Sequence, residues 1–315
     1  MKIDLHLPTG WNQCTVEELE HIAASILAEQ ALVSRYRIFD WDRVKVSIVL
    51  AINDITIMPS DDATVSADSV SGEEWLVKRP QDAEPWPLTA GHMQSLCEHL
   101  AFITDEKAAP LWRFPYPEID VRCKKEEGRA LSHQPSAIIH LQGPYPLLDG
   151  YTWREYRLLT DWMQEYMRCA NAMAQSKRED VRSKNQAALD KARNEFLAVL
   201  FKFATSDISH HTSDIFEGFS PIKWQVILFW WSGLMVQLAK KFPRVFKVQP
   251  VKKSRKGKQH TSPWDFYNSV TASIQKYIGG LSAQDVDNQP YGVTLQQLEM
   301  MAVEAEEMEK IKNKK

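Results

Sequence analysis

The sequence is poor in glycine, and its glycines do not form the loops that bind phosphate groups. It has 12 glycines in 315 residues, and the patterns G-x-x-x-x-G-K-[ST], G-x-G-x-x-G, G-x-S-x-G and H-E-x-x-H do not occur. Each of these patterns marks a family of nucleotide-binding proteins, hydrolases or metalloproteases. Their absence argues against a nucleotide-dependent enzyme. We expect a protein without enzymatic activity, without a small-molecule substrate and without a cofactor.

Cysteines are few and far apart. The four are Cys14, Cys97, Cys123 and Cys169, with no C-x-x-C pair among them. This spacing favours reduced, mostly buried thiols in an intracellular protein over a disulfide framework or a zinc site. The N-terminal residues contain no apolar segment of the kind found in secretory signals, so we expect a cytoplasmic protein.

The sequence has no long hydrophobic run. A membrane-spanning helix needs about 20 mostly apolar residues, whereas the longest candidate, residues 226–231, is interrupted by Ser232 and Gly233. Helical spacing instead places one broad apolar stripe on Trp224, Ile227, Leu228, Trp231, Leu234, Met235 and Leu238. We therefore predict a helix that is buried in a bundle, with a second helix covering Trp230, rather than a membrane segment.

Charge is nearly balanced. The chain has 38 basic and 41 acidic residues, a net charge of -3 and a pI near 6.3, which argues against a general nucleic-acid-binding protein. One basic run, "KKSRKGK", remains a weak candidate for contact with phosphates or an acidic partner through Lys252, Lys253, Arg255, Lys256 and Lys258. The run lacks aromatic residues, so it could attract nucleic acid but not read bases. A solvated linker is the interpretation that we favour.

The N-terminal part contains several helix-start signals. Thr15 followed by glutamates is typical of a capping box, and Thr89 precedes another segment with helical spacing. Residues 41–53 are ambiguous between strand and helix, because β-branched residues favour a strand while Asp40 could cap a helix. We favour the helix. A small hairpin is predicted around the Ser/Asp-rich stretch that follows.

Composition changes along the chain predict its organisation. Thr152 and Glu155 form a second capping-box pattern, and a proline-rich stretch that cannot form long helices precedes them. We place one short strand there, at "AIIHL". The fold class predicted is mainly α, a multi-unit helical bundle with a small β-hairpin in the N-terminal part. The units are a helical unit with the hairpin at 1–108, a proline-rich connection at 109–146, a central helical unit at 147–246, a basic linker at 247–263 and a C-terminal helical unit at 264–315.

Two groups of polar residues could suggest a site. His210 and His211 lie near Asp207 and Asp214, but adjacent histidines point in different directions and no third anchored ligand is visible, so we expect no metal site.

The second group lies on one predicted helix and consists of Glu155, Asp161 and Glu165. An acid/base pair would need burial or a partner that shifts one pKa, so we interpret these three carboxylates as a solvated helix face.

Several segments, taken in order, carry a resemblance. They are "LPTGWNQCTVEELEHIAASIL", "EEWLVKR", "PWPLTAGHMQSLCEHLAFI", "PLLDGYTWREYRLLTDWMQEYM", "FLAVLF", "SPIKWQVILFWWSGLMVQLAKKFPRVF" and "DFYNSVTASIQKYIGGLSAQDVDNQPYGVTLQQLEMM". In this order they resemble uncharacterised, tail-assembly-chaperone-like proteins from the tail-morphogenesis regions of bacterial prophages. The resemblance spans most of the chain and is a pattern of helices and aromatic residues, with no catalytic motif.

The resemblance implies a non-enzymatic tail-assembly protein that holds a tail protein of the tape-measure type in the cytoplasm of the bacterial host. From the residues, we expect the C-terminal unit to offer an apolar groove to a partner helix through Trp264, Phe266, Tyr267, Leu295 and Leu298. The alternative is that these residues pack on the main body. Two other functions remain open: a structural component of the virion, and a nucleic-acid-associated protein that uses the basic linker.

Overall fold

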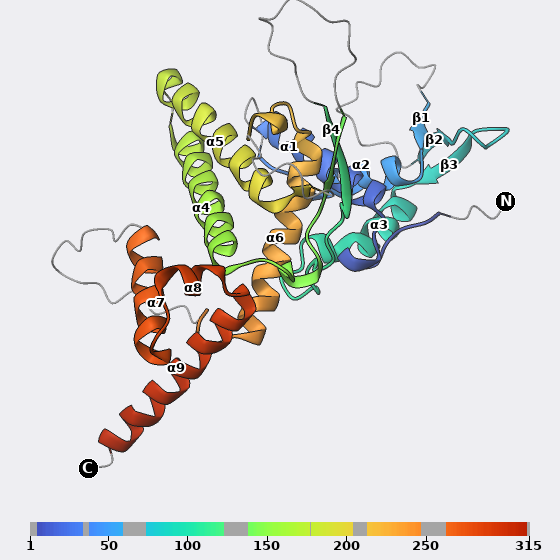
Figure 1. Cartoon of the computed structure of the whole chain (residues 1–315). Coiled ribbons are helices and arrows are strands. Elements are labelled where there is room, and N and C mark those ends of the chain that lie inside the picture. Colours follow the sequence, from blue (N-terminus) through green and yellow to red (C-terminus); the bar gives the residue numbers. More distant parts are fainter. Residues whose placement is uncertain are drawn as a thin grey trace, which may run out of the picture. The chain divides into compact units, whose positions relative to one another are not determined.

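A computed structural model describes residues 5–33, 38–58, 74–122, 138–176, 178–203, 213–246 and 263–313; of residues 74, 122, 203 and 263–269 only the backbone is described. Most of the described residues are helical, and the strands among them form two small antiparallel sheets (Figure 1). The mainly α fold class is confirmed, and so is a small β structure in the N-terminal part.

The chain divides into two compact units, each built from two separate stretches. Unit 1 comprises Met1–Pro115 and Ser220–Gly233, and unit 2 comprises Tyr116–Phe219 and Leu234–Lys315. The proline-rich stretch at 109–146 contributes to both units. The domain boundaries that we placed from composition stay predictions.

The first stretch of unit 1 contains three described α-helices, α1 (Val16–Val33), α2 (Trp41–Ile52) and α3 (Ala90–His99). Each begins at a side chain that accepts hydrogen bonds from the first turn. Thr15 and Glu18 bond each other's backbone amides as a capping box, Asp40 accepts from two amides of α2, and Thr89 accepts from one of α3. The ambiguous residues therefore form a helix, as we favoured.

The small sheet of unit 1 has three strands where we predicted a hairpin. They are β1 (Thr56–Ile57), β2 (Glu74–Lys78) and β3 (Trp86–Thr89), paired antiparallel in the order β1-β2-β3. Trp86 and Leu88 of β3 are buried and alternate with exposed Pro87, as expected for a strand that packs on one face. The short η2 helix (Leu100–Ile103) follows α3.

The core of unit 1 is one hydrophobic cluster that α1, α2, α3 and the sheet share. Its fully buried members include Ile22, Ile48, Val77 and Leu100. Trp11, in the short η1 helix (Trp11–Gln13), contacts the rings of Phe102 and Phe229, with centroid distances of 5.3 and 5.0 Å. These ring contacts connect the N-terminal segment to η2 and α6 (Pro221–Lys241).

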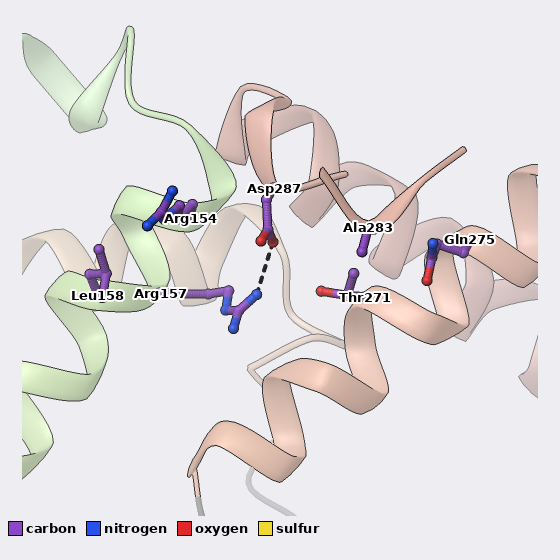
Figure 2. Close-up of a pocket in the computed structure, with 7 residues that line it drawn as sticks. All are labelled: Arg154, Arg157, Leu158, Thr271, Gln275, Ala283 and Asp287. Carbon is purple, nitrogen blue, oxygen red and sulfur yellow. Dashed lines mark hydrogen bonds and ion pairs between the residues drawn. The ribbon is translucent and has the colours of Figure 1, made fainter. Parts of the chain in front are cut away.

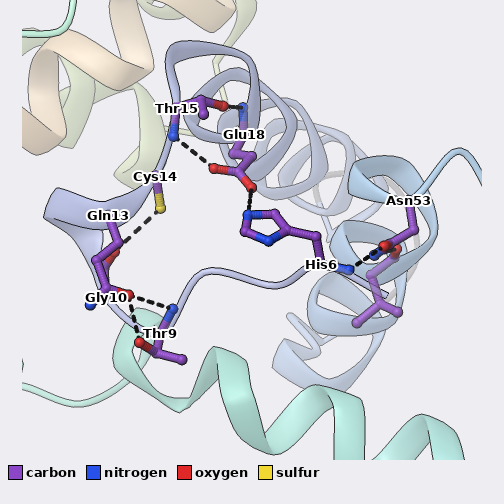
Figure 3. Close-up of polar contacts among 9 residues, drawn as sticks. His6, Thr9, Gly10, Gln13, Cys14, Thr15, Glu18 and Asn53 are labelled. Atoms are coloured by element: carbon purple, nitrogen blue, oxygen red, sulfur yellow. Dashed lines mark hydrogen bonds and ion pairs between the residues drawn. The ribbon is translucent and has the colours of Figure 1, made fainter. Parts of the chain in front are cut away.

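The N-terminal segment is held against α1 and α2 by polar contacts (Figure 3). The backbone amide of His6 donates to Asn53 Oδ1 at 2.9 Å, and His6 Nε2 lies 3.0 Å from Glu18 Oε1. Glu18 Oε2 accepts from the Thr15 amide at 2.7 Å. One buried carboxylate thus caps α1 and also fixes the segment that precedes it.

Helix α6 is the segment whose length and apolarity raised the question of a membrane helix. None of the helices within the described ranges is long and apolar enough to cross a membrane. Five residues of the predicted stripe are buried, namely Trp224, Ile227, Trp231, Leu234 and Leu238, whereas Leu228 and Met235 are half-buried. Trp230 is buried too, and the ring of Phe114 contacts it at 4.7 Å. We had predicted that a second helix covers Trp230, but the ring that packs on it comes from the proline-rich stretch.

Unit 2 contains a helical hairpin and a small sheet. The hairpin consists of α4 (Trp153–Gln175) and α5 (Glu179–Leu200), and the sheet has the order β4-β5-β6. The strands are β4 (Glu118–Arg122), β5 (Ile138–Gln142) and β6 (Lys202–Phe203). We predicted β5 but missed β4, because prolines surround it and its pairing with β5 is not visible in local sequence. The short helices are η3 (Pro146–Leu148) and η4 (Ser213–Phe216).

The C-terminal helices belong to unit 2 and are anchored on α4. They are α7 (Pro263–Ile278), α8 (Ala283–Asn288) and α9 (Tyr291–Lys312). The Tyr291 ring stacks on Tyr156 at 5.0 Å, and its hydroxyl donates to the carbonyl of Leu147. The Trp153 amide donates to the Gln289 carbonyl at 2.7 Å. These contacts fix the start of α9 against the start of α4.

Candidate partner-binding surface

The structure gives different positions to the residues that we predicted to bind a partner. Leu295 is 1 % exposed and lies in the interior of the fold, and Leu298 is half-buried. The side chains of Trp264, Phe266 and Tyr267 lie outside the described residues. Leu295 is therefore a core residue and cannot serve as a surface contact in this conformation.

Eight residues of the other predicted sites lie outside the described ranges. These are the basic run Lys252, Lys253, Arg255, Lys256 and Lys258, and the group Asp207, His210 and His211. Asp214, the remaining residue of that group, is described and lies in the first turn of η4. The described residues contain no group of three potential metal ligands.

The three carboxylates of α4 differ in their surroundings. Glu155 completes the capping box with Thr152 and lies 3.1 Å from Lys202 Nζ, and Glu165 pairs with Arg168. Both carboxylates are thus paired, Glu155 with a residue of β6 and Glu165 within its own helix. Asp161 differs, since both of its oxygens are buried without a hydrogen-bond partner. Burial raises the pKa of Asp161 to about 6, and the positive charge of Arg157 opposes that shift.

An apolar stripe lies on the exposed side of α9. Val293, Met300, Met308 and Ile311 are between 43 % and 62 % exposed. They are seven, eight and three residues apart, which is about two turns, two turns and one turn of an α-helix. These four residues, which we call the α9 stripe, therefore lie on one side of the helix. Glu304 interrupts the stripe, since it is four residues from both Met300 and Met308 and lies on the same side. The buried residues Tyr291, Thr294 and Leu295 face the body of unit 2 from another side.

Polar contacts hold α9 in place while the α9 stripe stays uncovered. Arg244 pairs with Glu299 at 3.0 Å and with Glu306 at 3.2 Å. The Tyr277 hydroxyl of α7 donates to Glu304 at 2.6 Å. Beyond Glu306 every described residue is exposed, and this end of α9 extends past α7 and α8 (Figure 1). The contacts of Glu299, Glu304 and Glu306 thus hold the helix, and Met308 and Ile311 are exposed at its end.

Sequence reasoning named the correct helix but only one of its two apolar rows. We had named Leu295 and Leu298 on this helix as partner-binding residues, and Leu295 lies in the interior instead. The second row is visible in the sequence as an apolar residue at each of positions 293, 300, 308 and 311. A row of this kind also fits a helix buried on two sides, so only the structure shows that it is exposed.

Unit 2 also contains a polar cleft between α4, α7 and α8. Its volume is about 510 Å³, and it is lined by Arg154, Arg157, Leu158, Thr271, Gln275, Ala283 and Asp287. Arg157 extends from α4 to Asp287 of α8, with an Nη1 to Oδ1 distance of 2.9 Å (Figure 2). The side-chain amide of Gln275 donates to the backbone carbonyl of Leu281 at 3.1 Å and holds the turn between α7 and α8.

Comparison with known proteins identified no relative of this chain. No family model, no curated protein and no solved structure matches the chain.

Proposed function

We propose that this chain is a non-enzymatic phage or prophage tail-assembly protein that acts in the cytoplasm of the bacterial host. In this proposal it binds a tail protein of the tape-measure type and releases it on polymerisation, without turnover. The order of segments along the sequence, with its resemblance to tail-morphogenesis proteins, motivates the choice of partner. The observation that carries the binding role is the exposed α9 stripe.

Three properties of the α9 stripe suit protein binding. Its large apolar side chains are exposed on a helix that the rest of unit 2 holds in place, and exposed apolar patches commonly mark interaction sites. Met300 and Met308 are flexible and polarisable, which lets one surface fit several packing arrangements. From Met300 to Ile311 the stripe is about 16 Å long at about 1.5 Å per residue, enough to contact about three turns of a partner helix.

The charges around the stripe indicate the chemistry of the partner. Glu304, Glu307 and Glu309 are exposed near Met308, and Lys310 and Lys312 are exposed on either side of Ile311. A basic amphipathic helix would place its apolar face on the stripe and its lysines or arginines near these glutamates, since electrostatic complementarity steers association and fixes register. The proposed occupant is therefore an amphipathic, basic helix of the tail protein.

The experiment compares the tagged wild-type protein with two variants in cells in which the prophage is induced. Met308→Glu places a charge in the α9 stripe, and Ala305→Glu places the same charge at an exposed position of α9 outside it. Each protein is purified by its tag and the captured proteins are identified by mass spectrometry. Circular dichroism confirms that both variants remain folded.

The wild type and Ala305→Glu are expected to capture one long tail protein, and Met308→Glu is expected to lose it. Mass spectrometry of purified particles runs beside the capture. Absence from particles supports transient assembly, whereas stable incorporation would make the chain a structural component of the virion. Equal capture by all three proteins would contradict a role for the stripe, and capture of nucleic acid alone would overturn the proposed function.

A further inference from the structure

The cleft between α4, α7 and α8 combines positive charge with an unsatisfied buried hydroxyl. Thr271 is 6 % exposed, and its Oγ1 has no hydrogen-bond partner in the described part of the chain. Leaving a buried hydroxyl without a partner is unfavourable, so such a group requires an explanation. Figure 2 shows the Thr271 oxygen directed toward the space beside Arg157.

Two arginines of α4 line the same cleft. Arg154 and Arg157 are three residues apart and so lie on neighbouring turns of one helix face. Arg157 is 6 % exposed and is held by Asp287. Arg154 is exposed and forms no ion pair with any residue that the structure describes. The cleft thus has one positioned guanidinium and one whose donors remain available to a ligand.

The charges lining the cleft do not cancel. Arg154 and Arg157 carry two positive charges, and Asp287 supplies one negative charge, so the lining has a net charge of about +1 at neutral pH. A ligand group with a single negative charge would neutralise the cleft. A phosphate dianion would instead face the Asp287 carboxylate with excess negative charge. A planar carboxylate also matches the fork geometry of a guanidinium.

We infer that this cleft is a binding site for a carboxylate group, which Arg154 and Arg157 contact and to which the Thr271 hydroxyl donates a hydrogen bond. The carboxylate belongs to an acidic side chain or chain end of a peptide, or to a small dicarboxylate. Leu158 and Ala283 supply the apolar part of the lining and would contact the carbon atoms beside that group. The site is separate from the α9 stripe and does not depend on the function proposed for it.

The first test measures binding to the full-length protein by titration calorimetry at constant ionic strength. The probes are a short peptide that ends in Asp-Glu, the same peptide with Asn-Gln and an amidated C-terminus, succinate, and inorganic phosphate. The acidic peptide or succinate is expected to bind and the amidated peptide is not. Whichever of the acidic peptide and succinate binds more tightly shows whether the natural ligand is a peptide or a small dicarboxylate. Binding of phosphate alone, or of none of the probes, would overturn the inference.

Two variants test the residues. Arg154→Ala is expected to weaken carboxylate binding about tenfold, or about 1.4 kcal/mol, because a charge-assisted hydrogen bond to the ligand is lost. Arg168→Ala, an exposed arginine on the same helix that does not line the cleft, is the matched control and should bind as the wild type does.

Thr271→Val removes the hydroxyl while keeping the shape of the side chain. It is expected to weaken binding about threefold without lowering the thermal unfolding temperature, because the hydroxyl has no partner to lose in the free protein. A lower unfolding temperature with unchanged binding would assign Thr271 a structural role and contradict its place in the site.

Discussion

Gly233 of α6 lies directly on the backbone carbonyl of Leu111. A Cβ atom added at Gly233 would stand 1.9 Å from that oxygen and 2.7 Å from the carbonyl carbon. Both residues belong to unit 1. Close contact between a helix and an extended, proline-rich stretch is possible here only because the helix has no side chain at this position.

The Gly233→Ala variant tests this contact, since two effects of the substitution change the free energy of unfolding in opposite directions. Helix propensity alone would stabilise the protein by about 1 kcal/mol, whereas forcing a methyl group against fixed backbone destabilises a core by about 1–3 kcal/mol or more. We expect net destabilisation, measured as the free energy of unfolding in urea. Gly91→Ala in α3 is the control, because the nearest atom to its added Cβ is 4.0 Å away. A stabilised Gly233→Ala variant would show that α6 and residue 111 are not in contact.

Loss of the capping box at α4 should be measurable in the stability of the protein. Thr152 Oγ1 accepts from the Glu155 amide at 3.2 Å, and Glu155 accepts from the Thr152 amide at 2.7 Å. Thr152→Ala removes one of these bonds and is expected to cost about 1 kcal/mol of unfolding free energy. Thr152→Ser keeps the hydroxyl and should cost little. Equal losses in the two variants would mean that the methyl group of threonine, and not the cap, matters at this position.

The ion pair between Arg157 and Asp287 joins helices that are far apart in the sequence. The side chains are 8 % and 29 % exposed, so removing one partner leaves a poorly solvated charge. A double-mutant cycle with alanine at each position should give a coupling free energy of about 1–3 kcal/mol.

Arg178 and Asp180, 2.7 Å apart but 75 % and 66 % exposed, are the matched pair on the surface, where coupling of less than about 1 kcal/mol is expected. Coupling as weak in the Arg157 pair as in this one would show that α8 is not fixed to α4 through that contact.

Asp161 should make stability depend on pH. Burial raises its pKa from 3.8 to about 6. Between these values the unfolded chain loses the proton while the folded protein keeps it, so this residue's contribution to stability falls as pH rises from about 4 to about 6 and then stays constant.

The Asp161→Asn variant removes that penalty. It should be more stable than the wild type by about 1 kcal/mol at pH 7.5, a value reduced for partial exposure to solvent, and the difference should vanish near pH 4. Urea unfolding at both values of pH measures it. A difference that stays the same at both would assign the effect to the change of shape and not to the charge.

Local sequence predicted the positions of many helices, and the reason is visible at their first residues. Thr15, Asp40, Thr89 and Thr152 each accept a hydrogen bond from an amide of the helix that follows. A cap needs only residues within one turn, so its signal is complete in the sequence. Strand β4 was missed because a strand is defined by its partner, and residues 118–122 pair with residues 138–142.

The candidate site was predicted less completely than the fold. The sequence indicated the C-terminal helices and the row that contains Leu295, but burial of Leu295 depends on the body of unit 2, which local pattern does not show. The cleft was not predicted at all. Its lining comes from residues 154–158, 271–275 and 283–287, and no short motif connects positions so far apart.

The sequence by itself determined that the chain is mainly helical, where its capped helices begin, and that no apolar run is long enough for a membrane helix, because these properties depend on neighbouring residues. Only the tertiary structure decided which row of α9 is buried and that Arg157 forms an ion pair with Asp287. It also decided that the carboxylate of Asp161 is buried and that the backbone of Leu111 packs against Gly233. These properties arise from contacts between segments that are far apart in the sequence. The free energy of such a contact depends on both segments, so the local sequence of one of them does not determine it.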